Sequence, residues 1–489
     1  MKQNKDETSF KKSLTPKSKN ISKWYNEVIQ LAELADYGPA KGTMVIRPYG
    51  YGIWENIQKA LDTEIKKSGA KNAYFPLFIP ESLFEKEKEH VKGFSPELAV
   101  VTIGGGEELT EKLVVRPTSE MIMYKLYAKW IKSWRDLPLV INQWNNVVRW
   151  EKRTYLFLRT SEFLWQEGHG AHATHEDSWE RVMWGIEAYK KINREFLAIP
   201  GIIGKKSPKE KFAGAVETLT YEVIIPGGKV LQGCTSHDLG QNFSRVQNIC
   251  FQDKEGKLEF VWQNSWGYST RVVGALVLVH GDDQGLVLPP KVAPIKSVII
   301  PILGKKDEEI IKYCQKVKET IEEYKSDFPG EVEIWGDTEK SFGWKVNEAE
   351  LKGIPVRITV GTRELYDRTV SLKKRIDSVK SILIRSGELP DKLEELLISI
   401  QAEMLNKAED YKNNNSREVN NFSEFKELMK TKRGFIRAFW CEDEKCEESI
   451  KEETKASTRC LELDAKEEKG KCIYCKKQAI HKWIFALAY

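Results

Sequence analysis

Residues 146–169 read NVVRWEKRTYLFLRTSEFLWQEGH, a stretch dense in charged and aromatic side chains. An apolar run ends in Arg149, a basic turn at 152–154 follows, and a second arm carries Arg159 and Phe163. The pattern predicts two antiparallel strands joined by a cationic loop. Two arginines can hold a polyphosphate through paired N–H donors, and an aromatic ring can cover a purine. A solvated hairpin with one amphipathic face fits the same residues, so the stretch alone leaves both interpretations open.

The residues ahead of this hairpin predict a helix, a strand and a polar turn. Apolar residues at helical spacing over 51–69 precede a strand-like run at 73–80, whose two prolines confine it to a sheet edge or an interface. A later strand runs into Thr118, Ser119 and Glu120 at the start of another helix. Thr118 or Ser119 suits a helix N-cap. In the alternative interpretation, Thr118 and Glu120 point into a pocket and hold a small ammonium group.

Histidines follow the hairpin at a spacing that resembles a metal site. His169, His172 and His175 form an H-x-x-H-x-x-H series. Gly168 and Gly170 indicate a loop there, and no carboxylate stands at HExxH spacing. A metal site at these histidines is therefore disfavoured.

Polar residues further along the chain predict more of a pocket. Residues 232–237 (QGCTSH) place small and polar side chains at a strand end. Gly267 and Arg271 flank a strand-to-helix junction, where the glycine lets a ligand approach the backbone and the arginine faces that space.

From residue 293 to about 387 strands and helices alternate, which predicts an independent α/β domain with a mixed sheet of about five strands. A long helix over 390–415 then ends in an asparagine run, which is typical of a linker.

In the last part of the chain, Cys441 and Cys446 have the spacing C-x4-C, and Cys472 and Cys475 the spacing C-x2-C. Two pairs of soft ligands suit a closed, structural zinc site. Another cysteine, Cys460, stands alone in a strand-like context.

Composition limits the class of protein. The chain has 489 residues, enough for roughly three domains. Lys+Arg number 77 against 72 Asp+Glu, so a purely electrostatic nucleic-acid binder is disfavoured. No apolar run approaches the ~18 residues of a membrane helix, and residues 1–20 are expected to form a basic, disordered tail rather than a signal peptide. Cysteines without a disulfide framework favour a reducing cytoplasm.

Five short strings resemble those of the prolyl-tRNA synthetases of the archaeal–eukaryotic type, a family of class II aminoacyl-tRNA synthetases. In chain order they are RPTSE (116–120), VVRWE (147–151), FLWQEGH (163–169), TSH (235–237) and WGYSTR (266–271). The resemblance covers nearly the whole chain after the tail, including the cysteine pairs and a final tyrosine, Tyr489. The helix and strand that end at Pro76 resemble motif 1, the dimer-forming element of the class. Residues 149–163 resemble motif 2, and residues 267–271 resemble motif 3.

The resemblance implies an α+β chain. A class II antiparallel-sheet catalytic domain is expected at 21–292, an α/β anticodon-binding domain at 293–390, a helical linker at 391–420 and a small zinc-binding α+β domain at 421–489. Contacts to proline are expected from Thr118, Glu120, Arg149, Trp165, His169 and His237. Contacts to ATP are expected from Arg149, Glu151, Arg159, Phe163, Gln232, Thr235, Ser269 and Arg271, of which Arg149 and Arg271 are catalytic. The anticodon is expected to contact Glu350 and Arg357, the tRNA backbone Lys374, Arg375 and Lys380, and zinc Cys441, Cys446, Cys472 and Cys475.

The implied enzyme is a cytoplasmic, membrane-free homodimer that attaches L-proline to tRNA(Pro). ATP with Mg²⁺ converts proline to prolyl-adenylate with release of pyrophosphate, and the 3′-terminal ribose of the tRNA then receives the prolyl group. A class II enzyme for another amino acid and a non-catalytic tRNA-binding paralogue are the alternatives. RPTSE and TSH argue against the first, and Glu120 with both motif arginines argues against the second.

Two residues depart from the family pattern. Ser161 stands where relatives often carry arginine, so one polar contact near ATP is missing. Cys234 stands where relatives often carry glycine, so the site is narrower or sensitive to thiol reagents. The segment between motifs 2 and 3 is also too short for the large editing domain that common bacterial relatives insert. Misactivation of alanine or cysteine without cis-editing is therefore expected.

Overall fold

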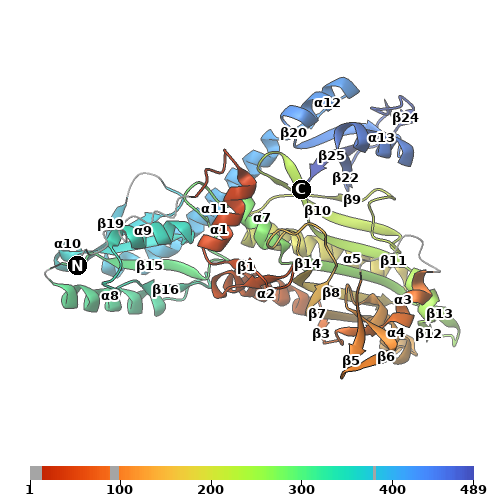
Figure 1. Ribbon diagram of the computed structural model, residues 1–489, viewed down its shortest axis with the longest axis horizontal. Coiled ribbons are helices and arrows are strands. Elements are labelled where there is room, and N and C mark those ends of the chain that lie inside the picture. The colour runs from red at the N-terminus through yellow and green to blue at the C-terminus, as the bar shows by residue number, and fades with distance from the viewer. Residues whose placement is uncertain (1–13, 89–97, 305, 378–380) are drawn as a thin grey trace. The chain divides into compact units, whose positions relative to one another are not determined.

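The computed structural model describes residues 14–88, 98–304, 306–377 and 381–489 (Figure 1). Most of the expected basic tail, and Lys380, lie outside the described residues. The chain divides into two compact units. The first comprises the described part of Met1–Tyr37 with Val45–Ile57 and Leu276–Met404, and the second comprises Gly38–Met44, Gln58–Ala275 and Leu405–Tyr489.

An eleven-stranded sheet runs through the second unit in the order β20-β21-β25-β22-β9-β10-β11-β14-β8-β7-β3. Its central strands pair antiparallel and are β9 (Ile202–Lys205), β10 (Glu217–Ile225), β11 (Lys229–Gly240), β14 (Trp262–Ser269), β8 (Glu162–His172) and β7 (Leu139–Val148). At one edge, β3 (Lys71–Asn72) runs parallel to β7. The predicted antiparallel catalytic sheet is confirmed.

The hairpin predicted at 146–169 forms from β7 and β8, with Val147 opposite Phe163. The loop predicted at Gly168 and Gly170 is wrong, because both residues lie inside β8. A Cβ on Gly168 would lie 2.2 Å from the ring of Trp266, and one on Gly170 would lie 2.6 Å from Asn264 Oδ1. These glycines therefore make room for side chains of the neighbouring strand β14 rather than marking a turn.

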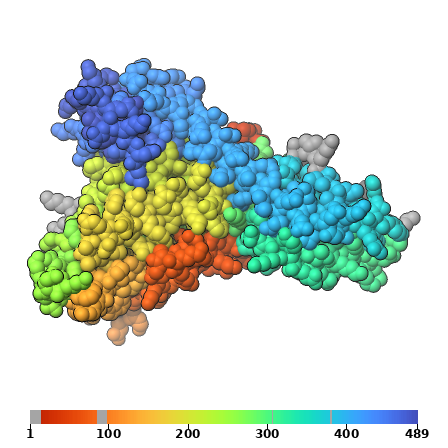
Figure 2. Space-filling view, turned by 180° about the vertical axis from the view of Figure 1, so that it is seen from behind, coloured from red at the N-terminus to blue at the C-terminus, as the bar shows by residue number. Residues whose placement is uncertain are grey.

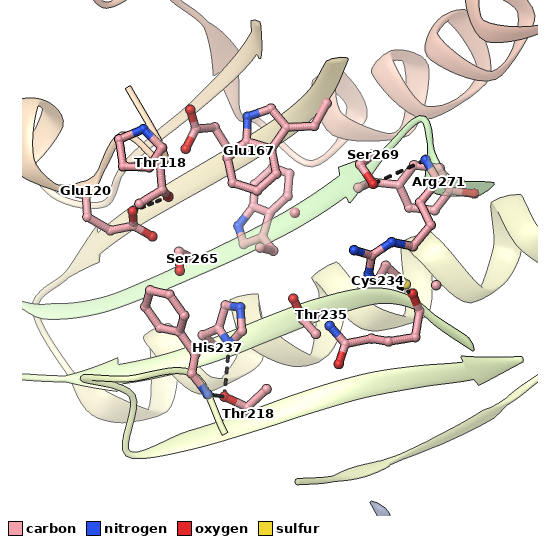
Figure 3. Close-up of a pocket in the computed structure, with 18 of the residues that line it drawn as sticks. Thr118, Glu120, Glu167, Thr218, Cys234, Thr235, His237, Ser265, Ser269 and Arg271 are labelled. Carbon is pink, nitrogen blue, oxygen red and sulfur yellow. Dashed lines mark hydrogen bonds between the residues drawn. The ribbon is translucent and has the colours of Figure 1, made fainter. Parts of the chain in front are cut away.

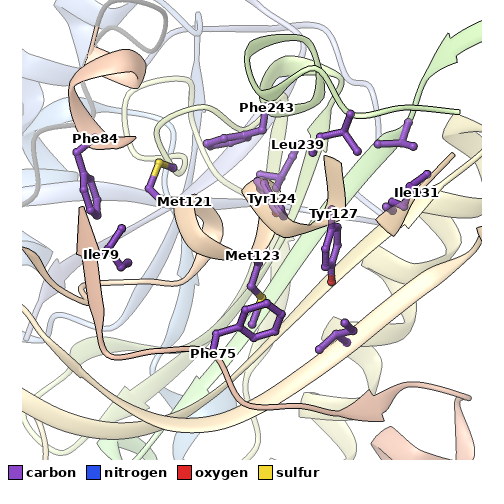
Figure 4. Packing of buried hydrophobic residues seen from close by; sticks show 14 of the residues in the cluster. Phe75, Ile79, Phe84, Met121, Met123, Tyr124, Tyr127, Ile131, Leu239 and Phe243 are labelled. Atoms are coloured by element: carbon purple, nitrogen blue, oxygen red, sulfur yellow. The ribbon is translucent and has the colours of Figure 1, made fainter. Parts of the chain in front are cut away.

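Apolar helices cover both faces of this sheet. On one face, α4 (Glu120–Trp130) buries Met121, Tyr124 and Tyr127 in a cluster that also contains Phe243 of α6 (Asn242–Gln247) (Figure 4). On the other face lies α5 (His175–Lys191), which continues as a π-helical turn at Ile192–Phe196. The proline-containing strand predicted at 73–80 is shorter, β4 (Phe78–Pro80), and forms the edge of a three-stranded sheet with β6 (Glu107–Val115) and β5 (Ala99–Gly104).

The C-terminal strands extend the catalytic sheet instead of forming a separate one. They are β20 (Ser416–Glu418), β21 (Phe435–Trp440), β22 (Ala456–Glu462) and β25 (His481–Ala488). β22 pairs with β9 and β25 with β11, so residues distant in sequence share one sheet. Figure 2 shows this C-terminal part, in blue, against the yellow part of the chain. Cys460 is buried in the apolar core of this junction with Ile202, Ile224 and Ile484.

The first unit contains a five-stranded sheet in the order β16-β15-β17-β18-β19. β15 (Ile295–Pro301) pairs parallel with β16 (Glu331–Ile334) and β17 (Val356–Val360), whereas β18 (Thr369–Lys374) and β19 (Ile382–Arg385) join antiparallel. The predicted mixed sheet is thus confirmed. The helices that follow its strands are α8 (Asp307–Glu322), α9 (Phe342–Leu351), α10 (Thr362–Asp367) and the first part of α11 (Leu389–Asn414).

The remaining elements are short or connect these layers: α1 (Ile21–Leu31), β1 (Ala35–Tyr37), β2 (Met44–Ile46), α2 (Pro48–Lys67), α3 (Glu81–Lys88), β12 (Cys250–Gln252), β13 (Leu258–Phe260), α7 (Arg271–His280), α12 (Phe422–Thr431), α13 (Glu444–Thr454), β23 (Gly470–Lys471) and β24 (Gln478–Ala479). Among the described residues, no helix has the length and apolar character needed to cross a membrane.

Candidate active site

A pocket of about 420 Å³ lies on the α4 face of the antiparallel sheet (Figure 3). It is lined by all of the residues predicted to contact proline or ATP except Glu151 and Arg159: Thr118, Glu120, Arg149, Phe163, Trp165, His169, Gln232, Thr235, His237, Ser269 and Arg271. The side chains come from the start of α4, from β8, β11 and β14, and from the start of α7. With Arg149, which follows β7, the structure thus brings together residues of all five sequence strings.

One end of the pocket is formed by the turn before α4. Thr118 and Glu120 are both 4 % exposed, and the Thr118 hydroxyl donates to the Glu120 carboxylate. Ser119 precedes the helix but makes no capping hydrogen bond with its side chain. Its backbone N–H and its hydroxyl instead donate to Glu167 of β8. Ser119 thus occupies the predicted N-cap position, but its side chain binds Glu167 instead of capping the helix, and Thr118 and Glu120 line the pocket as the alternative interpretation predicted.

Glu167 connects the side chains at this end of the pocket through hydrogen bonds. Its carboxylate accepts from Asn145 Nδ2 at 2.6 Å, and His169 Nε2 lies 3.1 Å from it. The other ring nitrogen of His169 lies 3.1 Å from the Tyr124 hydroxyl. Burial would raise the pKa of Glu167, but the hydrogen bond and charge of His169 and the hydrogen bonds from Ser119 and Asn145 lower it. Burial opposes the charged imidazole, yet Glu167 and Glu120 together raise the pKa of His169.

Sequence reasoning gave Glu167 no role of its own. The signal was present, because Trp165, Glu167 and His169 alternate along one strand and must share a face. Their common face is the one that carries the pocket. What the sequence could not supply was the partner set of Glu167, which comes from a separate turn and a neighbouring strand.

His237 forms the opposite wall. Thr218 Oγ1 lies 3.0 Å from His237 Nδ1 and also accepts from the backbone N–H of Phe212 at 3.0 Å. The Thr218 hydroxyl therefore joins the His237 ring to the backbone of Phe212 and fixes the orientation of the ring. Burial, with the nearby charges of His169 and Arg149, lowers the pKa of His237 to about 3, so the ring is neutral. Phe212 and Thr218 also line the pocket, and no motif in the sequence pointed to them.

Two arginines line the rest of the pocket: Arg271 lies at the end opposite Glu120 (Figure 3), and Arg149 lies between the two ends, next to Trp165. Arg149 Nε donates to the carbonyl of Pro117 at 3.0 Å, and its guanidinium lies 5.2 Å from the ring centroid of Trp165 and 5.6 Å from that of Phe163. Arg271 Nε donates to the carbonyl of Leu158 at 3.2 Å. Burial lowers the pKa of both groups, that of Arg271 to about 10, so both remain cationic at neutral pH. Backbone carbonyls thus hold the Nε atoms of both side chains, and Nη1 of Arg271 lies 3.5 Å from the carbonyl of Gln232.

Glu151 and Arg159 lie outside the pocket lining, on the hairpin, where Arg159 Nε donates to Glu151 at 2.8 Å. Ser161, the first departure from the family pattern, is packed against a neighbouring loop. Its backbone N–H donates to the carbonyl of Gly42 at 2.8 Å, and a Cβ on Gly42 would lie 2.3 Å from Ser161 Oγ. The space beside Ser161 is thus occupied by the Gly38–Met44 loop, which leaves no room there for a long side chain.

Cys234, the second departure, pairs directly with Tyr221 on β10 and Tyr268 on β14. Directly opposed residues share a sheet face, so the thiol lies with these tyrosines rather than beside Thr235. Burial raises the pKa of the Cys234 thiol well above its ordinary value, and the charge of Glu222 acts in the same direction. The reactive thiolate is therefore disfavoured, which argues against the expected sensitivity to thiol reagents.

The four paired cysteines converge as the zinc prediction requires. The sulfurs of Cys441, Cys446, Cys472 and Cys475 all lie within 4.8 Å of one another, and those of Cys441 and Cys475 are 3.6 Å apart. A Zn–S length of about 2.3 Å separates the sulfurs of a tetrahedral site by roughly 3.8 Å. The donor set and its spacing therefore fit zinc, and Cys460 is absent from the cluster.

In the five-stranded domain, Arg357 Nη1 lies 3.4 Å from Glu350, and Arg357 Nε is buried without a hydrogen-bond partner. Arg375 makes a bidentate ion pair with Asp282 at 2.8 and 2.6 Å, and its side chain is 4 % exposed. The predicted contact of Arg375 with the tRNA backbone is disfavoured, because burial and pairing occupy its guanidinium. Lys374 likewise pairs with Glu403 at 2.8 Å.

Comparison with protein families matches three consecutive parts of the chain. The model described as the class II tRNA synthetase core domain (G, H, P, S and T) matches residues 101–280, an anticodon-binding domain matches 296–396, and the C-terminal domain of prolyl-tRNA synthetase matches 422–489. The pocket lies within the first of these matches, and the cysteine cluster lies within the third.

Relatives of known activity match at full length. A proline–tRNA ligase of Natranaerobius thermophilus is 48% identical over 96% of this chain and 96% of its own, and one of Chlorobium phaeovibrioides is 49% identical over 97% and 99%. The crystal structure of prolyl-tRNA synthetase from Cryptosporidium parvum, complexed with halofuginone and AMPPNP, superposes with a TM-score of 0.92 at 41% identity, over 98% of this chain and 99% of that one. The chain therefore belongs to the prolyl-tRNA synthetases, the proline–tRNA ligases of class II.

Proposed function

We propose that this proline–tRNA ligase binds proline at the Glu120 end of the pocket and ATP at the arginine end, and joins them there as prolyl-adenylate. The observation that carries the proposal is the polarity of one continuous pocket. Buried carboxylates line one end, and two carbonyl-anchored guanidinium groups line the rest of the pocket. The prolyl ammonium and the ATP phosphates carry the complementary charges.

At the proline end, Glu120 and Thr118 receive the ammonium group. A buried carboxylate that accepts one protein hydrogen bond, from Thr118, retains acceptor positions for a cation. Both nitrogens of His169 are engaged by Glu167 and Tyr124, so this ring acts as a wall with Trp165 rather than as a ligand. His237 faces the same end, and its neutral ring supplies a polar contact without adding charge.

At the nucleotide end, Arg149 bridges the prolyl carboxylate and the α-phosphate, the two groups that react. A fixed cation between them orients the attack and stabilises charge that develops on the phosphorus oxygens. Phe163 covers the adenine, Arg271 contacts the γ-phosphate, and Gln232, Thr235 and Ser269 supply polar contacts. The Glu151–Arg159 pair lies next to this end and is proposed to close over the nucleotide.

Magnesium is proposed to accompany ATP and to neutralise the phosphates. It prefers oxygen ligands and is commonly held by one or two carboxylates together with substrate phosphates. Glu151 fits that role, because one of its oxygens accepts from Arg159 and the second remains for a cation. The residues of the chain then bind and orient, and no side-chain nucleophile takes part.

The decisive test is proline-dependent exchange of labelled pyrophosphate into ATP. Exchange with proline, followed by charging of tRNA(Pro), is the expected result. Exchange that depends on a different amino acid would point to another synthetase, and absence of any exchange would point to a non-catalytic paralogue.

The cysteine cluster is proposed to hold structural zinc. Four converging thiol groups beside the apolar cluster of the C-terminal part are the supporting observation. One zinc per chain is expected by metal analysis of the purified protein. The C472S variant should lose it, whereas C314S, which removes a lone buried thiol in α8, should retain it. An equal zinc content in both variants would contradict the proposal.

The proposed domain boundaries are those expected from the sequence, 21–292, 293–390, 391–420 and 421–489. The matches to the class II core and to the C-terminal domain fall within them, whereas the anticodon-binding match, 296–396, extends past residue 390 into the expected linker. We further propose the archaeal–eukaryotic type without cis-editing. The full-length match to the Cryptosporidium parvum enzyme supports the type. The segment between β8 and β14 supports the absence of a cis-editing domain. It consists of α5, the short elements α6, β12 and β13, and strands of the main sheet. Hydrolysis of alanyl-tRNA by the purified chain would contradict this.

Glu350 and Arg357 are proposed to read the anticodon, supported by the buried Nε of Arg357 that lacks a partner. A homodimer is proposed through the motif 1 region, where Tyr74 is 72 % exposed and Phe78 is 49 % exposed. A cytoplasmic location suits a cluster of thiols that can bind a metal.

The proposed anticodon role of Arg357 is tested by R357K, which should slow charging of tRNA without affecting pyrophosphate exchange. An equal loss in both assays would contradict the anticodon role.

A further inference from the structure

A buried ion cluster lies one strand away from the nucleotide end of the pocket. Glu222 of β10 is fully buried and accepts from Lys206 Nζ at 2.7 Å and from Thr220 Oγ1 at 2.8 Å. Arg459 of β22, 237 positions further along the chain, donates to the same carboxylate through Nε at 2.9 Å and Nη2 at 2.7 Å. None of these residues lines the pocket.

The Glu222 carboxylate at the centre of this cluster is charged at neutral pH. Burial would raise the pKa of Glu222, but Arg459 and Lys206 lower it to about 2. Lys206 is 7 % exposed and Arg459 6 % exposed. A well-packed apolar trio would stabilise a fold as well as a buried ion cluster does. Fold stability alone is therefore a weak explanation for placing three charges here.

Two β-bulges meet at this carboxylate. Between β10 and β11, Tyr221 pairs with Cys234 and Glu222 with Gln232, so Gly233 is the extra residue on β11. Between β22 and β25, Thr458 pairs with Phe485 and Cys460 with Ile484, so Arg459 is itself the extra residue on β22. Bulges re-aim side chains. The bulge in β22 directs Arg459 toward Glu222. The bulge in β11 lies opposite Glu222, the residue that Arg459 binds.

The bulge at Gly233 decides which way Gln232 points. Thr220 pairs with Thr235 and Glu222 with Gln232. Thr220 and Glu222 share a sheet face because they are two apart, and directly opposed residues share a face as well. Gln232 and Thr235 therefore share the pocket face, although a regular strand would send residues three apart to opposite faces. Without the bulge, Gln232 would face away from the nucleotide.

The cluster also influences the pocket electrostatically. Burial is the main cause that lowers the pKa of Arg271, and the charges of Arg149, Arg159 and Arg459 act in the same direction. Arg271 Nη1 in turn lies 3.5 Å from the carbonyl of Gln232, the residue opposite Glu222. One strand of backbone thus separates the ion cluster from the arginine of motif 3.

We propose that Arg459 and Glu222 are positioning residues for ATP: the C-terminal part of the chain holds, through this ion pair, the bulge that presents Gln232 to the nucleotide. The inference rests on the proposed function, in which Gln232 and Thr235 contact ATP. It assigns to the C-terminal strands a role in nucleotide binding that is separate from the zinc cluster and from the final tyrosine.

The test compares two arginines of the C-terminal part in the full-length protein. Arg437 forms a bidentate pair with Glu462 at 2.7 and 2.8 Å, the same chemistry as the Arg459–Glu222 pair, but Glu462 lies on β22 rather than on a pocket strand. In pyrophosphate exchange below the melting temperature, R459M should raise the KM for ATP by about tenfold or more, which corresponds to losing one charge-assisted interaction. The KM for proline should change by less than about twofold, and R437M should leave both constants unchanged.

R459K keeps the charge but loses the planar fork, so it covers the case in which R459M fails to fold. It should raise the KM for ATP by roughly two- to fivefold and leave the KM for proline unchanged. An unchanged KM for ATP in the folded variant, or an equal rise in both constants, would overturn the proposal. If the unmodified enzyme itself shows no proline-dependent exchange, the proposed function fails instead, so the two failures are distinguishable.

Discussion

The two ends of the pocket are built in different ways. The proline end is fixed by side chains that bind one another: Thr118 to Glu120, Ser119 and His169 to Glu167, and Tyr124 to His169. The nucleotide end is fixed by backbone, because Arg149 and Arg271 both donate to main-chain carbonyls. In the proposed function, the first arrangement holds proline. The second leaves the cationic groups available for phosphate.

This difference predicts how each end responds to substitution. Removing a side chain at the proline end leaves a buried partner unsatisfied, so that stability and proline binding both suffer. Removing an arginine at the nucleotide end leaves only carbonyls behind, so that the loss falls on the reaction.

The largest effect is expected for R149A. It removes the one cation proposed to contact both reacting groups, so the kcat/KM of pyrophosphate exchange should fall by about 10³-fold. Thermal stability should change little, because the Pro117 carbonyl that Arg149 binds borders a solvated pocket. Exchange kinetics with a parallel melting curve measure both quantities. A large loss of stability would contradict the expectation that substitutions at the nucleotide end affect the reaction and not the fold.

The next effect concerns the Glu167–His169 pair, and it is a loss of stability with a defined pH dependence. The pKa of Glu167 is lowered by folding, so its contribution is present above 4.5 and is lost as pH falls through the folded value. The pKa of His169 is raised, so its contribution is present below 6.5 and is lost as pH rises through the folded value. The pair therefore stabilises the fold most between these two values.

E167Q should accordingly lower the free energy of unfolding by about 3 kcal/mol at pH 5.5 and by less at pH 9. Melting temperatures at the two pH values measure it. E187Q, which removes an exposed partner of Lys190 on α5, should change neither. An equal loss at both pH values would show that the ion pair is not what stabilises this end.

A smaller effect is expected for E120Q, which keeps the shape of the side chain and removes its charge. The KM for proline should rise roughly 10- to 100-fold, the range for one hydrogen bond to a charged group. The KM for ATP should stay within about twofold, because Glu120 lies at the far end of the pocket. E162Q, which changes an exposed carboxylate at the start of β8, is the control. If E120Q raised both constants equally, the two ends would not be separate subsites.

The sequence predicted the ends of the pocket unequally. Glu120 and Arg149 stand in short, ordered strings, and strand alternation from Trp165 to His169 implies a shared face. In contrast, Gly168 and Gly170 were misread as a loop, because a glycine that admits a facing ring looks the same in sequence as one that allows a turn. Such close packing is decided by a partner distant in the chain.

The nucleotide end was predicted only in part for the same reason, because it depends on strand contacts that a single sequence does not show. The resemblance named Gln232, but a β-bulge leaves no mark in a single sequence, so the reason Gln232 and Thr235 share a face could not be inferred. The strands of the α+β domain expected at 421–489 likewise have partners that the sequence did not indicate: β22 and β25 pair with β9 and β11 through backbone groups that every residue carries. Periodicity predicts which segments are strands, whereas their partners follow from packing.

The smallest effect should come from the last residue, and it tests whether the nucleotide end depends on the C-terminal strands. Tyr489 donates its backbone N–H to Val230 of β11 at 3.1 Å, and its ring lies 6.1 Å from that of Tyr155, edge to face, in the turn of the motif 2 hairpin. Deletion of Tyr489 should lower the kcat/KM for ATP by about 2- to 10-fold, the range for one aromatic pair, without unfolding the protein. Y489F, which keeps the ring, should stay closer to the parent enzyme than Y489A. Normal kinetics after deletion would confine the influence of the C-terminal strands to Arg459.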